Sequence, residues 1–123
     1  IFWLKGPHLT GKSAIARNLL EEMSEDMSLR ATFFCSQFYN HRRNVSSIPP
    51  TLSFQLVRKY PEFNSALGLQ EENIYRVIQE EDTCLVIQEN NTSLECQVND
   101  LIIKPLKKSA ISTMIVIDGL DAC

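Results

Sequence analysis

The chain has 123 residues and a formal net charge of −3, with 44% hydrophobic and 22% charged residues. These proportions are typical of one globular domain or less, and they exclude a disordered chain. No apolar run approaches the roughly 20 residues that a membrane helix needs, so we expect no membrane partner. The sequence shows no basic stripe, so we also expect no nucleic-acid partner.

The cysteines and the first residues indicate the compartment. Cys35, Cys84, Cys96 and Cys123 show no C-x-x-C spacing, which argues against a zinc site and against a redox motif. The first residue is Ile, and no charged-then-apolar signal segment precedes the first predicted strand. We therefore expect a piece of a longer, reduced, cytoplasmic protein.

The first part of the chain predicts a strand, a helix and a second strand. Residues 1–6 are a short apolar run that ends at a glycine, which predicts a buried strand. Residues 12–26 predict a helix with one apolar stripe, and residues 31–36 are a second strand candidate. The apolar stripe of the helix consists of Ala14, Ile15, Leu19, Leu20 and Met23.

The next part predicts a loop followed by a helix. Residues 37–47 are polar and are expected to form a loop. Residues 48–60 predict a helix, because Pro49 and Pro50 suit a first helical turn and apolar residues follow at helical spacing. Pro61 is expected to stop this helix.

The remaining part predicts two helices. Residues 71–81 indicate one helix, whereas residues 84–89 are ambiguous between helix and strand. Thr92 or Ser93 could cap the last helix, which Pro105 is expected to kink or end. The apolar residues of this helix are Leu94, Val98, Leu101, Ile102 and Leu106.

A last strand completes the pattern. Residues 113–118 are strongly β-branched and end at Asp118. Strands separated by helices predict an α/β fold with a parallel sheet, which is buried on both faces.

The sequence GPHLTGKS, residues 6–13, fits the phosphate-binding pattern G-x-x-x-x-G-K-[ST]. Gly6 would turn the chain off the strand, and Gly11 would let the backbone approach the phosphates. Lys12 would reach the β and γ phosphates, and Ser13 would offer its hydroxyl to Mg²⁺. The predicted nucleotide-binding residues are Gly6, Pro7, His8, Leu9, Thr10, Gly11, Lys12, Ser13 and Ala14.

An acidic motif near the other end of the chain predicts the rest of the site. Asp118, at the carboxyl end of its strand, would hold Mg²⁺ opposite Ser13, so these two residues are the predicted metal ligands. Asp121 could be the catalytic residue that orients the attacking water, or it could cap a following helix. The residues alone leave both roles of Asp121 open.

These motifs together resemble a NACHT-type module of the STAND class of P-loop NTPases, in its fungal and nephrocystin-like branch. The matching stretches are FWLKGPHLTGKSAIAR (2–17), ATFFCS (31–36), HRRN (41–44), IPPTLSFQLVRKYP (48–61), LIIKPL (101–106) and DGLDAC (118–123). The resemblance implies that residues 1–123 are a partial NACHT or P-loop NTPase domain. It implies a three-layer P-loop fold with a parallel sheet, incomplete because it ends after the strand that carries Asp118.

The resemblance also implies a function. It implies that ATP or GTP binds with Mg²⁺ and controls a signalling switch, which self-associates through parts outside this chain. In that fold a further strand follows and lies between the first strand and the strand of Asp118. We therefore expect the fragment alone to be poorly folded and inactive.

Two departures from the family pattern bear on activity. Leu9 stands where glycine is usual, and a leucine at positive φ costs on the order of 1–2 kcal/mol. Ala122 stands where glutamate is usual, so we expect slow or impaired hydrolysis. Two alternatives stay open, namely a degenerate P-loop scaffold that binds proteins without nucleotide, and a small-molecule kinase.

Overall fold

The computed structural model describes residues 2–7, 9–25, 29–68 and 93–122, and its centre is a parallel pair of strands. Strand β1 (Leu29–Phe34) pairs with β2 (Met114–Asp118), with Phe34 aligned to Asp118. Both strands were predicted from the sequence, and their bounds differ from the prediction by one or two residues.

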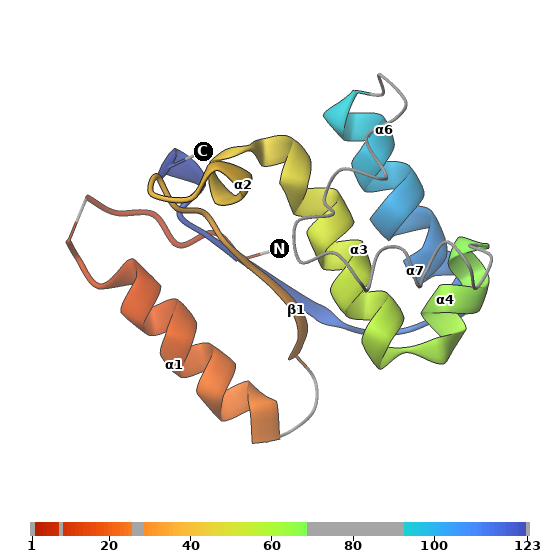
Figure 1. Ribbon diagram of the computed structural model, residues 1–123. Coiled ribbons are helices and arrows are strands. Elements are labelled where there is room, and N and C mark those ends of the chain that lie inside the picture. The colour runs from red at the N-terminus through yellow and green to blue at the C-terminus, as the bar shows by residue number, and fades with distance from the viewer. Residues whose placement is uncertain (1, 8, 26–28, 69–92, 123) are drawn as a thin grey trace.

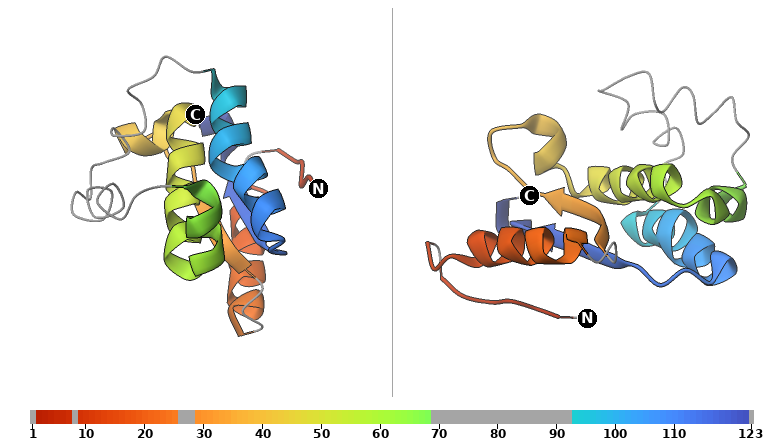
Figure 2. Two further views of the ribbon diagram at one scale, coloured as in Figure 1. Left: turned by 90° about the vertical axis from the view of Figure 1, so that its right-hand side faces the viewer. Right: turned by 90° about the horizontal axis from the view of Figure 1, so that it is seen from below.

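Helices lie on both sides of this pair of strands (Figures 1 and 2). Helix α1 (Lys12–Glu25) lies on one side, and its bounds agree with the helix predicted from residue 12. Helices α3 (Ile48–Lys59), α4 (Pro61–Leu67) and α7 (Lys104–Ser109) lie on the other side. The arrangement is α/β, whereas the three-layer P-loop fold stays a prediction.

The hydrophobic core lies between β1 and the helices on the side of α3. Leu56 of α3 and Phe63 of α4 are 0% exposed, and they are the largest apolar side chains that this core buries completely. Burying one such side chain stabilises a protein by about 1.5–3 kcal/mol. The buried cluster consists of Ala31, Phe33, Ile48, Leu52, Leu56, Phe63 and Ile102.

The segment between β1 and α4 contains more helix than its sequence predicts. The predicted loop 37–47 includes the short helix α2 (Asn40–Arg43) and the 3-10 turn η1 (Val45–Ser47). Pro61 does follow the end of α3, but it also opens α4, a helix that the prediction lacked. The reason is that proline has no N–H to donate, which suits the first turn of a new helix.

The last helix continues past a proline to Ser109, so the predicted end at Pro105 is wrong, whereas the predicted kink stays a prediction. The π-turn η3 (Asn99–Ile103) joins α6 (Leu94–Val98) to α7, and the Lys104 N–H donates to the Asn99 carbonyl five residues back. In this wider turn the N–H groups bond to carbonyls five residues back instead of four. Pro105, at the second position of α7, has no N–H group and therefore leaves no donor without an acceptor. The helix therefore passes the proline without a break.

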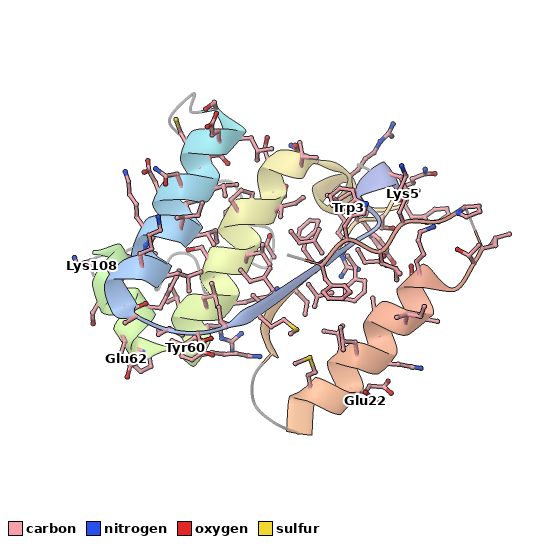
Figure 3. The ribbon with its side chains drawn as sticks, turned by 180° about the vertical axis from the view of Figure 1, so that it is seen from behind. Trp3, Lys5, Glu22, Tyr60, Glu62 and Lys108 are labelled. Atoms are coloured by element: carbon pink, nitrogen blue, oxygen red, sulfur yellow. The ribbon has the colours of Figure 1, made fainter. Side chains whose placement is uncertain are left out.

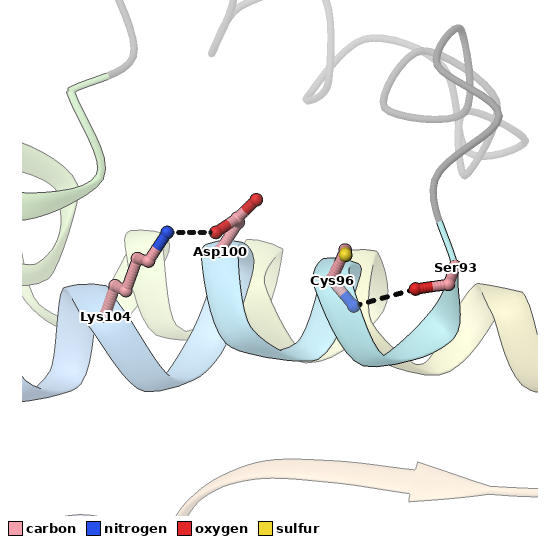
Figure 4. A network of polar contacts seen from close by, with 4 residues as sticks. All are labelled: Ser93, Cys96, Asp100 and Lys104. Carbon is pink, nitrogen blue, oxygen red and sulfur yellow. Dashed lines mark hydrogen bonds and ion pairs between the residues drawn. The ribbon is translucent and has the colours of Figure 1, made fainter.

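Side chains support the start of α6 and the π-turn that follows it (Figure 4). Ser93 caps α6 as predicted, because its hydroxyl accepts a hydrogen bond from the Cys96 N–H at 3.3 Å. Lys104 donates to Asp100 at 2.6 Å, and this hydrogen bond, followed by the charge of the carboxylate, raises the pKa of Lys104. Thr92 and the predictions for residues 71–81 and 84–89 lie outside the described residues.

The strand predicted at residues 1–6 is wrong over the part that the structure describes. Residues 2–7 have no regular structure, and Trp3 is 74% exposed (Figure 3). A strand needs a hydrogen-bonding neighbour, and the two described strands pair with each other and not with this segment. The apolar run alone was therefore not sufficient to form a strand.

The apolar stripe of α1 is only partly buried, although the sequence predicts a sheet that is buried on both faces. Leu20 and Met23 are half-buried, whereas Ala14, Ile15 and Leu19 are exposed, Ile15 to 54%. Neighbouring strands lie about 4.8 Å apart, whereas a helix with its side chains is about 10 Å wide. A sheet of two strands is therefore too narrow to cover the apolar face of α1.

We expect the core around α3 to set the stability of the fold. Replacement of Leu56 by alanine (Leu56→Ala) should lower the free energy of unfolding by about 2–5 kcal/mol, because it removes a fully buried side chain and leaves a cavity. Urea unfolding followed by circular dichroism measures this change. Lys59→Ala, on the exposed side of the same helix, is the control and should change it by less than about 0.5 kcal/mol. Equal effects of the two substitutions would contradict this account of the core.

Candidate functional site

The loop before α1 curls through two residues with positive φ. Leu9 has φ +64° and Gly11 has φ +85°. Glycine adopts this conformation readily, whereas a leucine pays on the order of 1–2 kcal/mol there. The side chain of Leu9 is fully exposed, so no packing against the described residues compensates for this strain. His8 lies outside the described residues.

Hydrogen bonds within the loop hold Lys12 across it. The Lys12 ammonium donates to the carbonyl oxygens of Gly6 and Pro7, both at 2.7 Å. The Thr10 hydroxyl also donates to the Pro7 carbonyl, at 2.8 Å. A Cβ on residue 6 would lie 3.2 Å from the Thr10 hydroxyl oxygen, so glycine at this position leaves room for the threonine. Both of these carbonyl acceptors are neutral, so neither of them offsets the positive charge of Lys12.

The loop leads directly into the amino end of α1. The Gly11 carbonyl accepts the first helical hydrogen bond, from the Ile15 N–H at 2.9 Å. The first turn of α1 contains no acidic residue, so no carboxylate there offsets the positive end of the helix dipole. Ser13 and Ala14, in this turn, are exposed to solvent. Local positive charge of this kind favours an anion.

The carboxyl end of β2 is held by β1. The Cys35 N–H donates to the Asp118 carbonyl at 2.9 Å, which extends the pairing of the strands to their last residues. Asp118 is half-buried. Gly119 follows with φ +73°, and a Cβ on it would lie 3.2 Å from the Cys35 carbonyl oxygen. Both the conformation and the close approach require glycine directly after Asp118.

Asp121 follows in the 3-10 turn η4 (Leu120–Ala122), where its side chain is exposed. Helix α1 runs antiparallel to β1 and β2, so its amino end points to the same end of the molecule as the carboxyl ends of both strands (Figures 1 and 2). The fold thus brings Ser13, Asp118 and Asp121 to one end of the sheet. The hydrogen bonds of Lys12 and Thr10 hold these two residues against Gly6 and Pro7 within one loop.

One feature near this end was missed by the sequence prediction. In the segment after β1, the guanidinium of Arg42 lies 5.3 Å from the centre of the Tyr39 ring, a cation–π distance. Phe38, beside Tyr39, is almost fully exposed. The three-residue spacing of Tyr39 and Arg42 was the available signal, but it indicates contact only if the loop contains a helical turn, as α2 provides.

The comparison with protein families gives one match. A family described as Nephrocystin 3, N-terminal, matches residues 1–123. The chain belongs to this nephrocystin family. This match confirms the nephrocystin-like part of the resemblance noted in the sequence, and it extends over the whole chain. No curated protein and no solved structure matches the chain. In the described part of this family member, no helix has the length and hydropathy to cross a membrane.

We expect the turn after Asp118 to tolerate glycine only. Gly119→Ala should lower the free energy of unfolding by at least about 1 kcal/mol more than Gly68→Ala does. The reason is that the methyl group added at position 119 would press against the Cys35 carbonyl oxygen. Gly68 is a matched control, since its φ is +71° and no atom of the described residues lies within 4 Å of the position that a methyl group would take there. Thermal and urea unfolding of both variants measure the difference. Equal losses would show that Cys35 does not constrain this turn.

Proposed function

We propose that this chain is the nucleotide-binding module of a NACHT-type signalling switch, which binds Mg²⁺ with ATP or GTP and hydrolyses it slowly. The observation that supports it best is the loop of residues 6–13. This loop curls through two residues with positive φ, presents the start of α1, and carries a lysine whose hydrogen-bond acceptors are uncharged.

The loop has the chemistry to bind phosphate groups. The N–H groups at the start of α1 have no partners within the helix and can donate to anionic oxygens. Lys12 adds a full positive charge at the same place, and its tether to Gly6 and Pro7 orients the ammonium before any ligand arrives. An oriented donor loses less entropy on binding than a free one.

The residues at the end of the sheet fit a magnesium ion. Mg²⁺ prefers hard oxygen ligands and usually combines one or two protein groups with phosphates and water. The Ser13 hydroxyl and the Asp118 carboxylate would provide those protein oxygens. When bound, the metal would supply charge neutralisation for the phosphates.

Slow hydrolysis follows from the residues after Asp118. The methyl group of Ala122 can neither orient a water molecule nor accept its proton. Asp121 is the remaining carboxylate of this turn and is the proposed group that orients the water. A module that holds its nucleotide for long periods suits a switch, with self-association through parts outside residues 1–123. A cytoplasmic location is also part of the proposal.

Lys12→Ala tests the proposal. We expect this substitution to weaken binding of Mg·ATP or Mg·GTP by at least about tenfold, because hydrogen bonds to a charged group contribute about 1.5–3 kcal/mol each. Isothermal titration calorimetry on the full-length protein, with each nucleotide in turn, measures the affinity. Lys5→Ala is the control, since Lys5 is an exposed lysine outside the loop and its removal should leave the affinity unchanged.

The same titration decides between the proposal and its alternatives. If the unaltered protein binds no better than Lys12→Ala, the nucleotide switch is wrong and a scaffold that binds other proteins is favoured. The strained Leu9 and the exposed Phe2 and Trp3 would then be features of a protein-binding surface. Rapid phosphoryl transfer to a small acceptor would instead indicate a kinase.

Asp118→Asn tests the proposed metal ligand. With Asp118 present, Mg²⁺ should raise the affinity for ATP, whereas the amide should remove most of this gain because it carries no charge. Titrations with Mg²⁺ and with EDTA measure the gain as a ratio of two dissociation constants. Asp100→Asn is the control, because Asp100 pairs with Lys104 on an exposed helical face and should leave the ratio unchanged. A full magnesium effect in Asp118→Asn would exclude this aspartate as a ligand.

A further inference from the structure

The outer edge of β1 is the edge of the strand that faces away from β2. The direction of the backbone N–H and C=O groups decides which residues of β1 face this edge. In a strand, the N–H and C=O groups of successive residues point to opposite edges. The Cys35 N–H reaches β2 at Asp118, so the groups of Phe33 also point toward β2. The groups of Thr32, which alternates with them, point to the outer edge of β1.

A side chain occupies this outer edge. The Oε1 atom of Gln55, on α3, accepts a hydrogen bond from the Thr32 N–H at 2.8 Å, and its Nε2 atom donates to the Thr32 carbonyl at 2.9 Å. A carboxamide presents one acceptor and donor groups on the same side, as the C=O and N–H groups of one residue in an adjacent antiparallel strand do. Gln55 therefore makes with Thr32 both hydrogen bonds that a third strand would make.

The packing of α3 fixes this glutamine in place. Leu52 and Leu56, on the same helix, are buried in the core beside β1. The helix axis is thus held against the strand independently of Gln55. Gln55 and Thr32 are themselves only half-buried, so solvent or another chain could compete for the Thr32 backbone if the glutamine were absent.

We infer that Gln55 seals the outer edge of β1 at Thr32 and prevents a second copy of this chain from adding a strand there. An edge strand with free N–H and C=O groups is a template for pairing with another chain. A second copy is the relevant competitor because it carries the same short β-rich segments and is present whenever the protein is. The seal directs any extension of the sheet to the opposite edge, where the backbone groups of Ile115 and Ile117 point.

This inference does not depend on nucleotide binding, and amide hydrogen exchange tests it. In the unaltered chain, the Thr32 amide should exchange slowly, as the Phe33 amide does, although only Phe33 faces the neighbouring strand. Gln55→Met keeps the length of the side chain and removes both hydrogen bonds. It should speed exchange at Thr32 by at least about fivefold relative to Phe33, since one hydrogen bond is worth about 1 kcal/mol.

Self-association is the second readout. Gln55→Met should raise the association constant for dimerisation by at least about tenfold, measured by analytical ultracentrifugation over a range of concentrations. Gln37→Met, the same chemical change at an exposed loop position, should leave it unchanged and controls for added surface hydrophobicity.

Three results would overturn the inference. One is rapid exchange of the Thr32 amide in the unaltered chain, which needs no variant and decides the matter even if Gln55→Met fails to fold. Another is continued protection of Thr32 in a folded Gln55→Met. The third is loss of protection without any increase in self-association, which would leave Gln55 as a local support only.

Discussion

The parallel pairing of β1 with β2 is the interaction on which the rest of the structure depends. It joins segments that lie far apart in the sequence, and parallel strands require a long crossover between them. The helices α3, α4, α6 and α7 all belong to this crossover, and residues of α3, α4, η3 and α7 cover β1 in the main hydrophobic core. The same pairing continues through Cys35 to the Asp118 carbonyl, so it also fixes the candidate site at the end of β2.

The two sides of the sheet are packed very differently. On the side of α3, fully buried leucine and phenylalanine side chains form a continuous core. On the side of α1, part of the helical stripe and the aromatic residues near the start of the chain stay exposed. A parallel sheet is normally covered on both faces, and two strands give too little surface for that. The exposed apolar residues are therefore a consequence of sheet width and not of an unusual composition.

The candidate site combines local and long-range order. Hydrogen bonds between residues close in the sequence shape the loop around Lys12, so its geometry is a local property of the chain. Leu9 was expected to be strained if its φ were positive, and its φ is +64°. By contrast, the position of Asp118 relative to α1 depends on strand pairing. Its role as a metal ligand is a proposal that the motif and this shared end of the sheet support.

The sequence by itself determined the elements whose signals are local. These are α1 after the glycine-rich loop, α3 with prolines in its first turn, the cap at Ser93, and the two β-branched or aromatic strands. Only the tertiary structure decided whether an apolar run became a strand, since residues 2–7 have no described strand to pair with. It also decided whether a helix could pass Pro105, since that depends on the π-turn before it. It also decided that Gln55 closes one edge of the sheet. Short-range propensities act within a few residues, whereas strand pairing and burial depend on groups that only the folded chain brings together.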